Sequence, residues 1–115
     1  INMLRSIPDL IQEIRPKVRC VTSSSAKLEM SNNGGILIDV REPMEVAQNP
    51  TPNALNIPRG VLEMKVSELH PHEETPLYIH CATGARATLS AEQLMRIGYK
   101  HVSVITCDIE TICQS

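Results

Sequence analysis

The chain has 115 residues, the length of one domain with its own buried core, and its 42% hydrophobic and 21% charged residues are typical of a globular protein. The net charge of −2 and the near absence of aromatic residues (Tyr78 and Tyr99 alone) give no reason to expect nucleic acid or an anionic membrane as partner. No apolar run approaches the roughly 20 residues of a membrane span. We find no signal-peptide pattern either, and expect a cytoplasmic protein, although a chain that begins at Ile1 is compatible with a removed leader.

The residues before position 18 predict an amphipathic helix. Apolar side chains recur at helical spacing, Ser6 or Pro8-Asp9 gives a start signal and Pro16 a stop. Such a helix can bind a membrane or a partner, but we expect it to pack on its own domain. We therefore divide the chain into an N-terminal helix over residues 1–17 and one domain over residues 18–115.

The remaining residues alternate between strand and helix patterns. We expect helices over 22–30, 43–47, 61–69 and 86–97, and strands over 18–21, 36–40, 54–58, 77–80 and 101–106. The strands over 36–40 and 77–80 are continuous apolar runs, as in parallel sheets that are buried on both faces. The alternation predicts an α/β fold, in which a parallel sheet is covered by helices on both sides.

The cysteines predict free thiols rather than a disulfide framework. No Cys-x-x-Cys pair occurs, and neither His70-x-His72 nor the Cys107 to Cys113 spacing fits a zinc site. We therefore expect no metal. The four cysteines are Cys20, Cys81, Cys107 and Cys113.

Cys81 is the candidate nucleophile, because it joins a buried strand to a helix through a loop of small residues. Sites in open parallel sheets form at the carboxyl ends of strands. The N-terminus of a helix presents free N–H groups and a partial positive charge. Small side chains let these N–H groups converge on the sulfur, Gly84 can adopt a positive φ angle, and Arg86 adds a fixed charge. We expect the substrate to bind to Ala82, Thr83, Gly84, Ala85 and Arg86.

This pattern predicts a cradle for an anionic sulfur. The thiolate is the reactive form of cysteine, and a persulfide on Cys81 would be anionic too. The alternative is a structural cysteine, since cysteine is a common small buried residue. The residues alone leave both interpretations open.

Four segments, in the same order, resemble the rhodanese family. Residues 39–42 resemble its Asp-x-Arg-Glu signature, and residues 54–58 resemble its Ala-x-Asn-Ile-Pro segment. Residues 81–86 resemble its catalytic Cys-x-x-Gly-x-Arg loop, and residues 94–102 resemble its Leu-x-x-x-Gly-aromatic-x-x-Val stretch. The ordered set covers most of the chain.

The resemblance implies a three-layer α/β domain, whose central, mostly parallel sheet of about five strands is flanked by helices. It implies an enzyme like thiosulfate sulfurtransferase, which moves sulfane sulfur from thiosulfate or a persulfide donor, through a Cys81 persulfide, to a thiophilic acceptor. The acceptor would be a thiol, either a small molecule or a protein. No metal or organic cofactor is implied, and neither the physiological donor and acceptor nor the oligomeric state follows from the resemblance.

Two other functions remain open. One is a non-catalytic rhodanese-like interaction module, but inactive relatives often lose the loop cysteine that this chain keeps. The other is a phosphatase or arsenate reductase. Those enzymes place five residues between cysteine and arginine, whereas four separate Cys81 from Arg86. The shorter loop favours sulfur transfer.

Other polar residues are expected to have structural roles. Asp39 and Arg41 should pair and brace the Cys81 loop. His80 should pack in the interior or face solvent rather than act as a base. The remaining histidines, His70, His72 and His101, lie in polar stretches and should be solvated.

Two segments depart from the family pattern. Cys107 and Asp108 stand where the family has Gly-Gly, so Cys107 is a candidate second thiol that receives sulfur or forms a disulfide with Cys81. A tolerated substitution is the simpler alternative, and either way the catalytic efficiency is left open. Residues 49–53 replace a Gly-His-Ile-Pro-Gly segment, which leaves the shape of the pocket rim and the donor specificity open.

Overall fold

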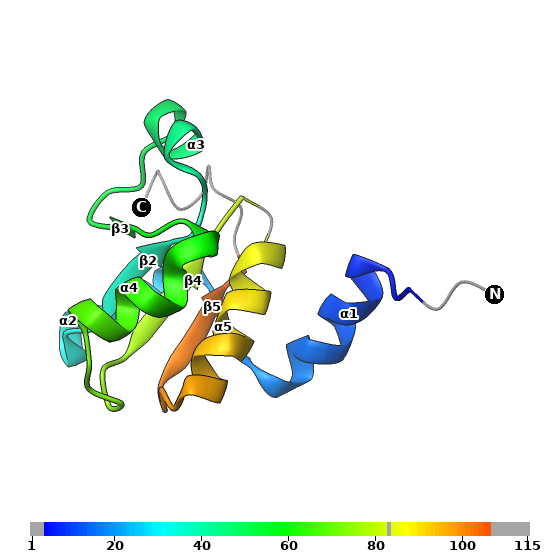
Figure 1. Ribbon diagram of the computed structural model, residues 1–115. Coiled ribbons are helices and arrows are strands. Elements are labelled where there is room, and N and C mark those ends of the chain that lie inside the picture. Colours follow the sequence, from blue (N-terminus) through cyan, green and yellow to red (C-terminus); the bar gives the residue numbers. More distant parts are fainter. Residues whose placement is uncertain (1–3, 83, 107–115) are drawn as a thin grey trace.

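A single sheet of five parallel strands forms the centre of the structure, a computed structural model that describes residues 4–82 and 84–106 (Figure 1). Its spatial order is β1-β5-β4-β2-β3, and all four neighbouring pairs are parallel. The α/β class and the five-stranded parallel sheet expected from the sequence are thereby confirmed. The strands are β1 (Arg19–Val21), β2 (Ile36–Asp39), β3 (Leu55–Asn56), β4 (Leu77–His80) and β5 (Val102–Ile105).

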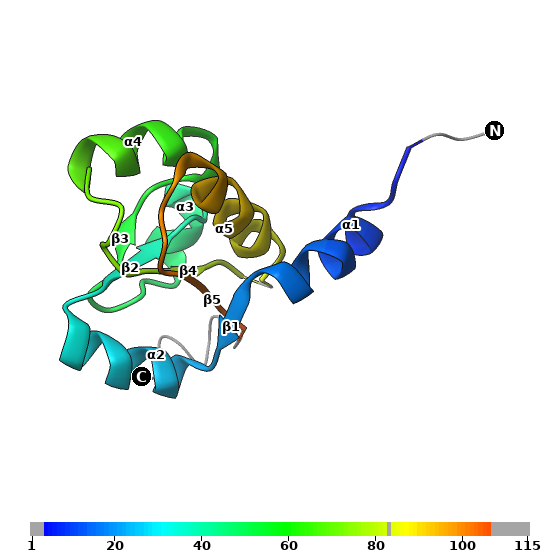
Figure 2. The ribbon, with the colours of Figure 1, turned by 90° about the horizontal axis from the view of Figure 1, so that it is seen from below.

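Helices cover both faces of this sheet. Figure 2 shows α2 on one side and α4 and α5 on the other. β4 and β5 are buried at every position, which explains why both are continuous apolar or small-residue runs. The helices are α1 (Ile7–Ile14), α2 (Ser23–Asn33), α3 (Pro43–Gln48), α4 (Leu62–Leu69) and α5 (Ala85–Ile97), with 3₁₀ turns η1 (Arg15–Lys17) and η2 (Arg59–Val61).

The core has two parts because side chains alternate along each strand. In β4, Leu77 and Ile79 belong to the larger cluster, which includes Leu62 and Val66 of α4 and residues of α5. Tyr78 belongs to the smaller cluster on the α2 side. Cys81, directly after β4, belongs to the larger cluster, so its side chain lies on the α5 side of the sheet.

The N-terminal helix α1 extends away from the body beside α5 (Figure 1). The hydroxyl of Ser6 accepts a hydrogen bond from the N–H of Asp9, the cap that starts the helix. Ile14 is buried in the larger core cluster, whereas Leu4 and Ile7 are exposed. Within residues 4–82 and 84–106, no helix is long and apolar enough to cross a membrane.

Two elements differ in length from their expected ranges. α2 continues to Asn33, since its stop is Gly34, which has a left-handed φ of 69°. The strand expected over 54–58 is reduced to β3. Beyond Asn56, whose amide donates to the carbonyls of Asp39 and Arg41, the N–H groups of Ile57 and Arg59 still donate to the end of β2, but Pro58 between them has no N–H to continue a regular ladder.

Candidate functional site

Cys81 lies at the carboxyl end of the central strand, with its side chain 1% exposed. Two backbone N–H groups donate to its sulfur, from Gly84 at 3.1 Å and Ala87 at 3.3 Å. Both groups come from the loop and the first turn of α5, where N–H groups have no carbonyl partner within the helix. The structure thus brings part of the expected loop around the sulfur, while Thr83 lies outside the described residues.

The loop conformation depends on Gly84. Its φ of 93° is left-handed, which a residue with a Cβ adopts only under strain. Its carbonyl accepts from both the N–H (2.9 Å) and the hydroxyl (2.7 Å) of Thr88, which is fully buried. These bonds hold the first turn of α5 in place, and with it the N–H of Ala87 that reaches Cys81.

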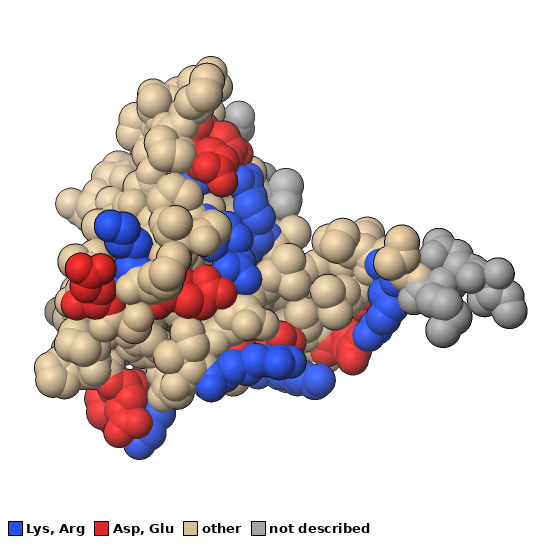
Figure 3. All heavy atoms as spheres, viewed as in Figure 1, with Lys and Arg blue, Asp and Glu red and all other residues tan. Residues whose placement is uncertain are grey.

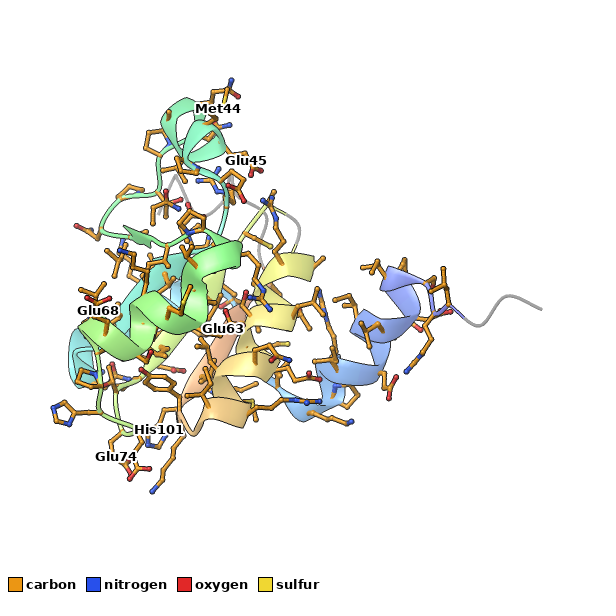
Figure 4. All side chains as sticks on the ribbon, in the orientation of Figure 1. Met44, Glu45, Glu63, Glu68, Glu74 and His101 are labelled. Carbon is orange, nitrogen blue, oxygen red and sulfur yellow. The ribbon has the colours of Figure 1, made fainter. Side chains whose placement is uncertain are left out.

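Arg86 forms a bidentate ion pair with Glu45 of α3, at 2.7 and 2.8 Å. Figure 4 shows Glu45 on α3, above the start of α5. The Arg86 guanidinium, and secondarily the N–H of Glu42, hold the pKa of Glu45 at about 2. Glu45 raises the pKa of Arg86 above its ordinary value, with smaller contributions from Cys81 and Glu42. Arg86 is therefore charged and close to Cys81, but its charge is shared with a carboxylate.

Asp39 and Arg41 form the buried pair that the sequence predicts. Arg41 is 2% exposed and donates to both carboxylate oxygens of Asp39. Its other hydrogen bonds reach the carbonyls of Glu45 and Asn49 and the hydroxyl of Thr51. The pair therefore holds the segment that carries α3. No hydrogen bond from either side chain to residues 81, 82 or 84–86 is found, and the expected bracing of the Cys81 loop stays a prediction.

His80 is a packing residue. Its side chain is fully buried on the face opposite Cys81, and neither ring nitrogen has a hydrogen-bond partner within the described part of the chain. Burial lowers the pKa of His80, the charge of Arg41 acts in the same direction, and Asp39, 3.8 Å away, opposes both. The ring is accordingly neutral. The solvent-facing alternative for His80 was wrong.

Three other expectations concern Cys107 with Asp108, the segment 49–53 and the remaining histidines. Cys107 and Asp108 lie outside the described residues, so the second-thiol prediction stays a prediction. Within the segment 49–53, residues 51–53 line a hollow of about 320 Å³ against α2, together with Met30 and Leu37. His72 and His101 are exposed and His70 is half-buried.

Two residues at the site were missed from the sequence. Glu45 had a signal as a helix cap, because Glu42 and Glu45 form a capping box around Pro43, but nothing local points to Arg86. Arg15 of η1 had none. Its Nη2 atom lies 3.1 Å from the position that a Cβ on Gly84 would occupy, so the N-terminal segment reaches the loop.

Comparison with known proteins identifies relatives that are named sulfurtransferases. A sulfurtransferase of Allochromatium vinosum is 34% identical over 67 residues, which cover 58% of this chain and 61% of the relative. The mitochondrial thiosulfate sulfurtransferase of Saccharomyces cerevisiae is 30% identical over 101 residues, which cover 77% of this chain and 67% of the relative. The matches thus cover between three fifths and two thirds of the length of these relatives.

Solved structures agree on the fold. The polysulfide-sulfur transferase homodimer of Wolinella succinogenes superposes with a TM-score of 0.73 at 25% identity, over 89% of this chain and 77% of that one. A Rhodopseudomonas palustris protein of unknown function, named a possible tyrosine phosphatase, gives 0.80 at 22% identity, over 99% and 93% of the two chains. At that identity the second likeness shows the fold alone. The model of the Rhodanese-like domain family matches residues 22–115, and the chain therefore belongs to this family, whose curated relatives here are sulfurtransferases.

Proposed function

We propose that this chain is a thiosulfate sulfurtransferase-like enzyme in which Cys81 carries the transferred sulfur as a persulfide. The observation that carries the proposal is the convergence of two backbone N–H groups on the sulfur of Cys81. Relatives that are named thiosulfate sulfurtransferases support it at about 30% identity. The donor is a small anionic sulfur compound, and the acceptor is a thiol or a thiol-bearing protein.

In the first half-reaction, the Cys81 thiolate attacks the outer sulfur of thiosulfate. A new S–S bond forms to Cys81 while the S–S bond of thiosulfate breaks, and sulfite leaves with the bonding electron pair. In the second, the acceptor attacks the terminal sulfur of the persulfide. With cyanide as acceptor, a C–S bond forms while the S–S bond of the persulfide breaks, so that thiocyanate leaves and the bonding electron pair restores the Cys81 thiolate.

The described residues assist both steps through charge. The N–H groups of Gly84 and Ala87 donate to the sulfur of Cys81, which is anionic before the first attack and again when it leaves as thiolate in the second. Arg86 stays positively charged, because the ion pair with Glu45 raises its pKa above the ordinary value. Because Arg86 shares its charge with Glu45, it stabilises the anionic persulfide without holding it too tightly for the second transfer.

Thiocyanate formation from thiosulfate and cyanide tests this function. We expect the wild-type chain to form thiocyanate and to gain the mass of one sulfur atom on Cys81 after donor treatment. Cys81→Ser should do neither, while Cys20→Ser, which removes an exposed thiol on β1, should behave as wild type. If wild type and Cys81→Ser have equal rates, the proposal fails.

Two results would favour the alternatives. A protein that never gains sulfur on Cys81 would be an interaction module that has kept its cysteine. Turnover of an aryl phosphate that depends on Cys81 would indicate a phosphatase instead.

A further inference from the structure

Arg15 is a second arginine beside the Cys81 loop, and it comes from outside the segment that matches the family. It belongs to η1, directly after α1, whereas the family match begins at residue 22. Its Nη2 lies 3.1 Å from the position of a Cβ on Gly84. The N–H of Gly84 in turn lies 3.1 Å from the sulfur of Cys81, measured from the nitrogen. The guanidinium of Arg15 thus lies beside Gly84, whose N–H donates to the sulfur of Cys81.

The side chain of Arg15 is unpaired. Among residues 4–82 and 84–106 it makes no hydrogen bond or ion pair, and its Nε is buried without a partner. A buried N–H of a charged group without an acceptor is unfavourable, so such a group is expected to have a ligand in the working state. The other arginines of this region are engaged, Arg86 by Glu45 and Arg41 by Asp39.

Packing, rather than its own bonds, places Arg15. Ile11 and Ile14 of α1 are buried, Ile14 within the larger core cluster, and α1 contacts α5. The 3₁₀ turn that begins at Arg15 then leads into β1. Packing of α1 against α5 therefore places the backbone of Arg15 where its side chain reaches the loop, and a side chain placed in this way pays less of the ordering cost of binding an anion.

The charges of the other arginines near Cys81 are already paired. Each described arginine other than Arg15 is balanced by a carboxylate, and Glu42 is close enough to Arg86 to raise its pKa. A doubly negative donor such as thiosulfate would meet no unshared positive side chain there, except Arg15. Figure 3 shows acidic and basic side chains lying together below α3, on the side of the start of α5.

We propose that Arg15 is a substrate-binding residue, whose guanidinium holds the oxyanion end of an anionic sulfur donor while the donor's outer sulfur faces Cys81. This inference rests on the proposed sulfurtransferase function for the identity of the donor. Gly84 contributes by lacking a side chain, since a Cβ would intrude between the loop and the guanidinium. An N-terminal helix would then supply part of the donor selectivity of the domain.

Donor kinetics test the charge. Arg15→Gln should raise the KM for thiosulfate about tenfold and leave kcat within about twofold, since one charge-assisted hydrogen bond is lost. The KM for the monoanion benzenethiosulfonate should rise less, about threefold. Arg15→Lys should recover most of the loss. Lys17→Gln removes a charge from the same turn, next to Met95 and Arg96 near the far end of α5, and should change neither KM.

Alkylation of Cys81 tests the same inference without sulfur transfer. The ratio of the rates with anionic iodoacetate and neutral iodoacetamide cancels differences in thiolate reactivity. Arg15→Gln should lower this ratio severalfold, Arg15→Lys should restore it, and Lys17→Gln should keep the wild-type ratio. An unchanged ratio in Arg15→Gln would overturn the inference and leave Arg15 a packing residue. A lowered ratio in a chain without thiocyanate formation would refute only the proposed function and retain Arg15 as an anion-binding residue.

Discussion

Two arginine–glutamate pairs stand at opposite ends of the sheet with the same chemistry and different surroundings. Arg86 and Glu45 lie at the carboxyl end, and Arg19 and Glu29 at the amino end, where Figure 4 shows the nearby Glu74 and His101. Both pairs are bidentate, and in both the arginine holds the pKa of the glutamate at about 2. A shifted pKa therefore does not separate a site from a structural bridge.

The two ends of the sheet differ in which side chains are left without a partner to bind a ligand. At the amino end, the hydroxyl of Tyr78 donates to Glu29 and accepts from Asn33, and Arg19 also donates to Ser103. These groups bond to one another, although they border a hollow of about 600 Å³. At the carboxyl end, the sulfur of Cys81 and the guanidinium of Arg15 have no carboxylate partner among the described residues. The proposed functional end therefore differs from the other end by a thiol and a guanidinium without a carboxylate partner, and not by the volume of a hollow or by ion pairing.

The largest effect should come from Cys81. Loss of the nucleophile in Cys81→Ser should lower the rate of thiocyanate formation about a thousandfold or more, because the persulfide cannot form. Glu29→Gln, at the other end of the sheet, should change the same rate less than twofold. A large loss of activity in Glu29→Gln would erase the distinction between the two ends.

Gly84→Ala should have the next largest effect. A Cβ at a φ of 93° strains the backbone, by about 1–3 kcal/mol, and it meets Arg15. We expect a lower free energy of unfolding in urea and transfer about tenfold slower, as the N–H groups leave the sulfur. Gly60→Ala is the matched control, since a Cβ there meets nothing within 4 Å. Wild-type kinetics in Gly84→Ala would show that the loop geometry is not required.

Glu45→Gln and Glu29→Gln compare the two pairs directly. Each should reduce the free energy of unfolding only slightly, since all four side chains are about one third to one half exposed and screened by solvent. Glu45→Gln should also lower the KM for thiosulfate about threefold, because it removes a carboxylate from beside Arg86. Steady-state kinetics on both variants measure this. A KM that rises in Glu45→Gln would show that the pair serves the loop mainly as a brace.

The smallest effect concerns pH. Because burial lowers the pKa of His80 below its ordinary value of 6.5, the unfolded chain binds more protons than the folded one below that pH. Stability should therefore fall as the pH falls from 7 to 5. His80→Leu, which keeps an apolar side chain in the same space, should reduce this slope, while His101→Gln, at an exposed site, should not. Urea unfolding at both pH values is the measurement. Equal slopes in wild type and His80→Leu would exclude His80 as the cause.

Glu45 and Glu29 make the free energy of unfolding depend on pH in a lower range as well. Their pKa values are depressed from 4.5 to about 2, so the stabilisation by each pair is present above about pH 4.5 and is lost as the pH falls toward 2. This range lies below that of His80, and the two contributions can be separated.

Most elements were predicted from the sequence because their signals are local. Ser6 and Thr22 cap the helices that follow them, and Gly34 and Gly98 end theirs with positive φ angles. The extent of β3 was not predicted, because it depends on how this segment bonds to the end of β2, through the Asn56 side chain and the N–H groups of Ile57 and Arg59. Errors thus arose where a contact with a distant strand outweighed the local pattern.

The sequence by itself identified the candidate nucleophile and predicted its loop. A buried strand, Cys81, small residues, Gly84 and a helix start are contiguous, and their geometry follows from backbone preferences and from helix ends. Only the tertiary structure decided which charged side chains from other elements lie beside the loop. Glu45, 41 residues before Arg86, and Arg15, from a helix outside the family match, reach the loop through packing of whole elements. Local patterns carry no record of such contacts, because ion pairs between distant segments depend on how the helices pack.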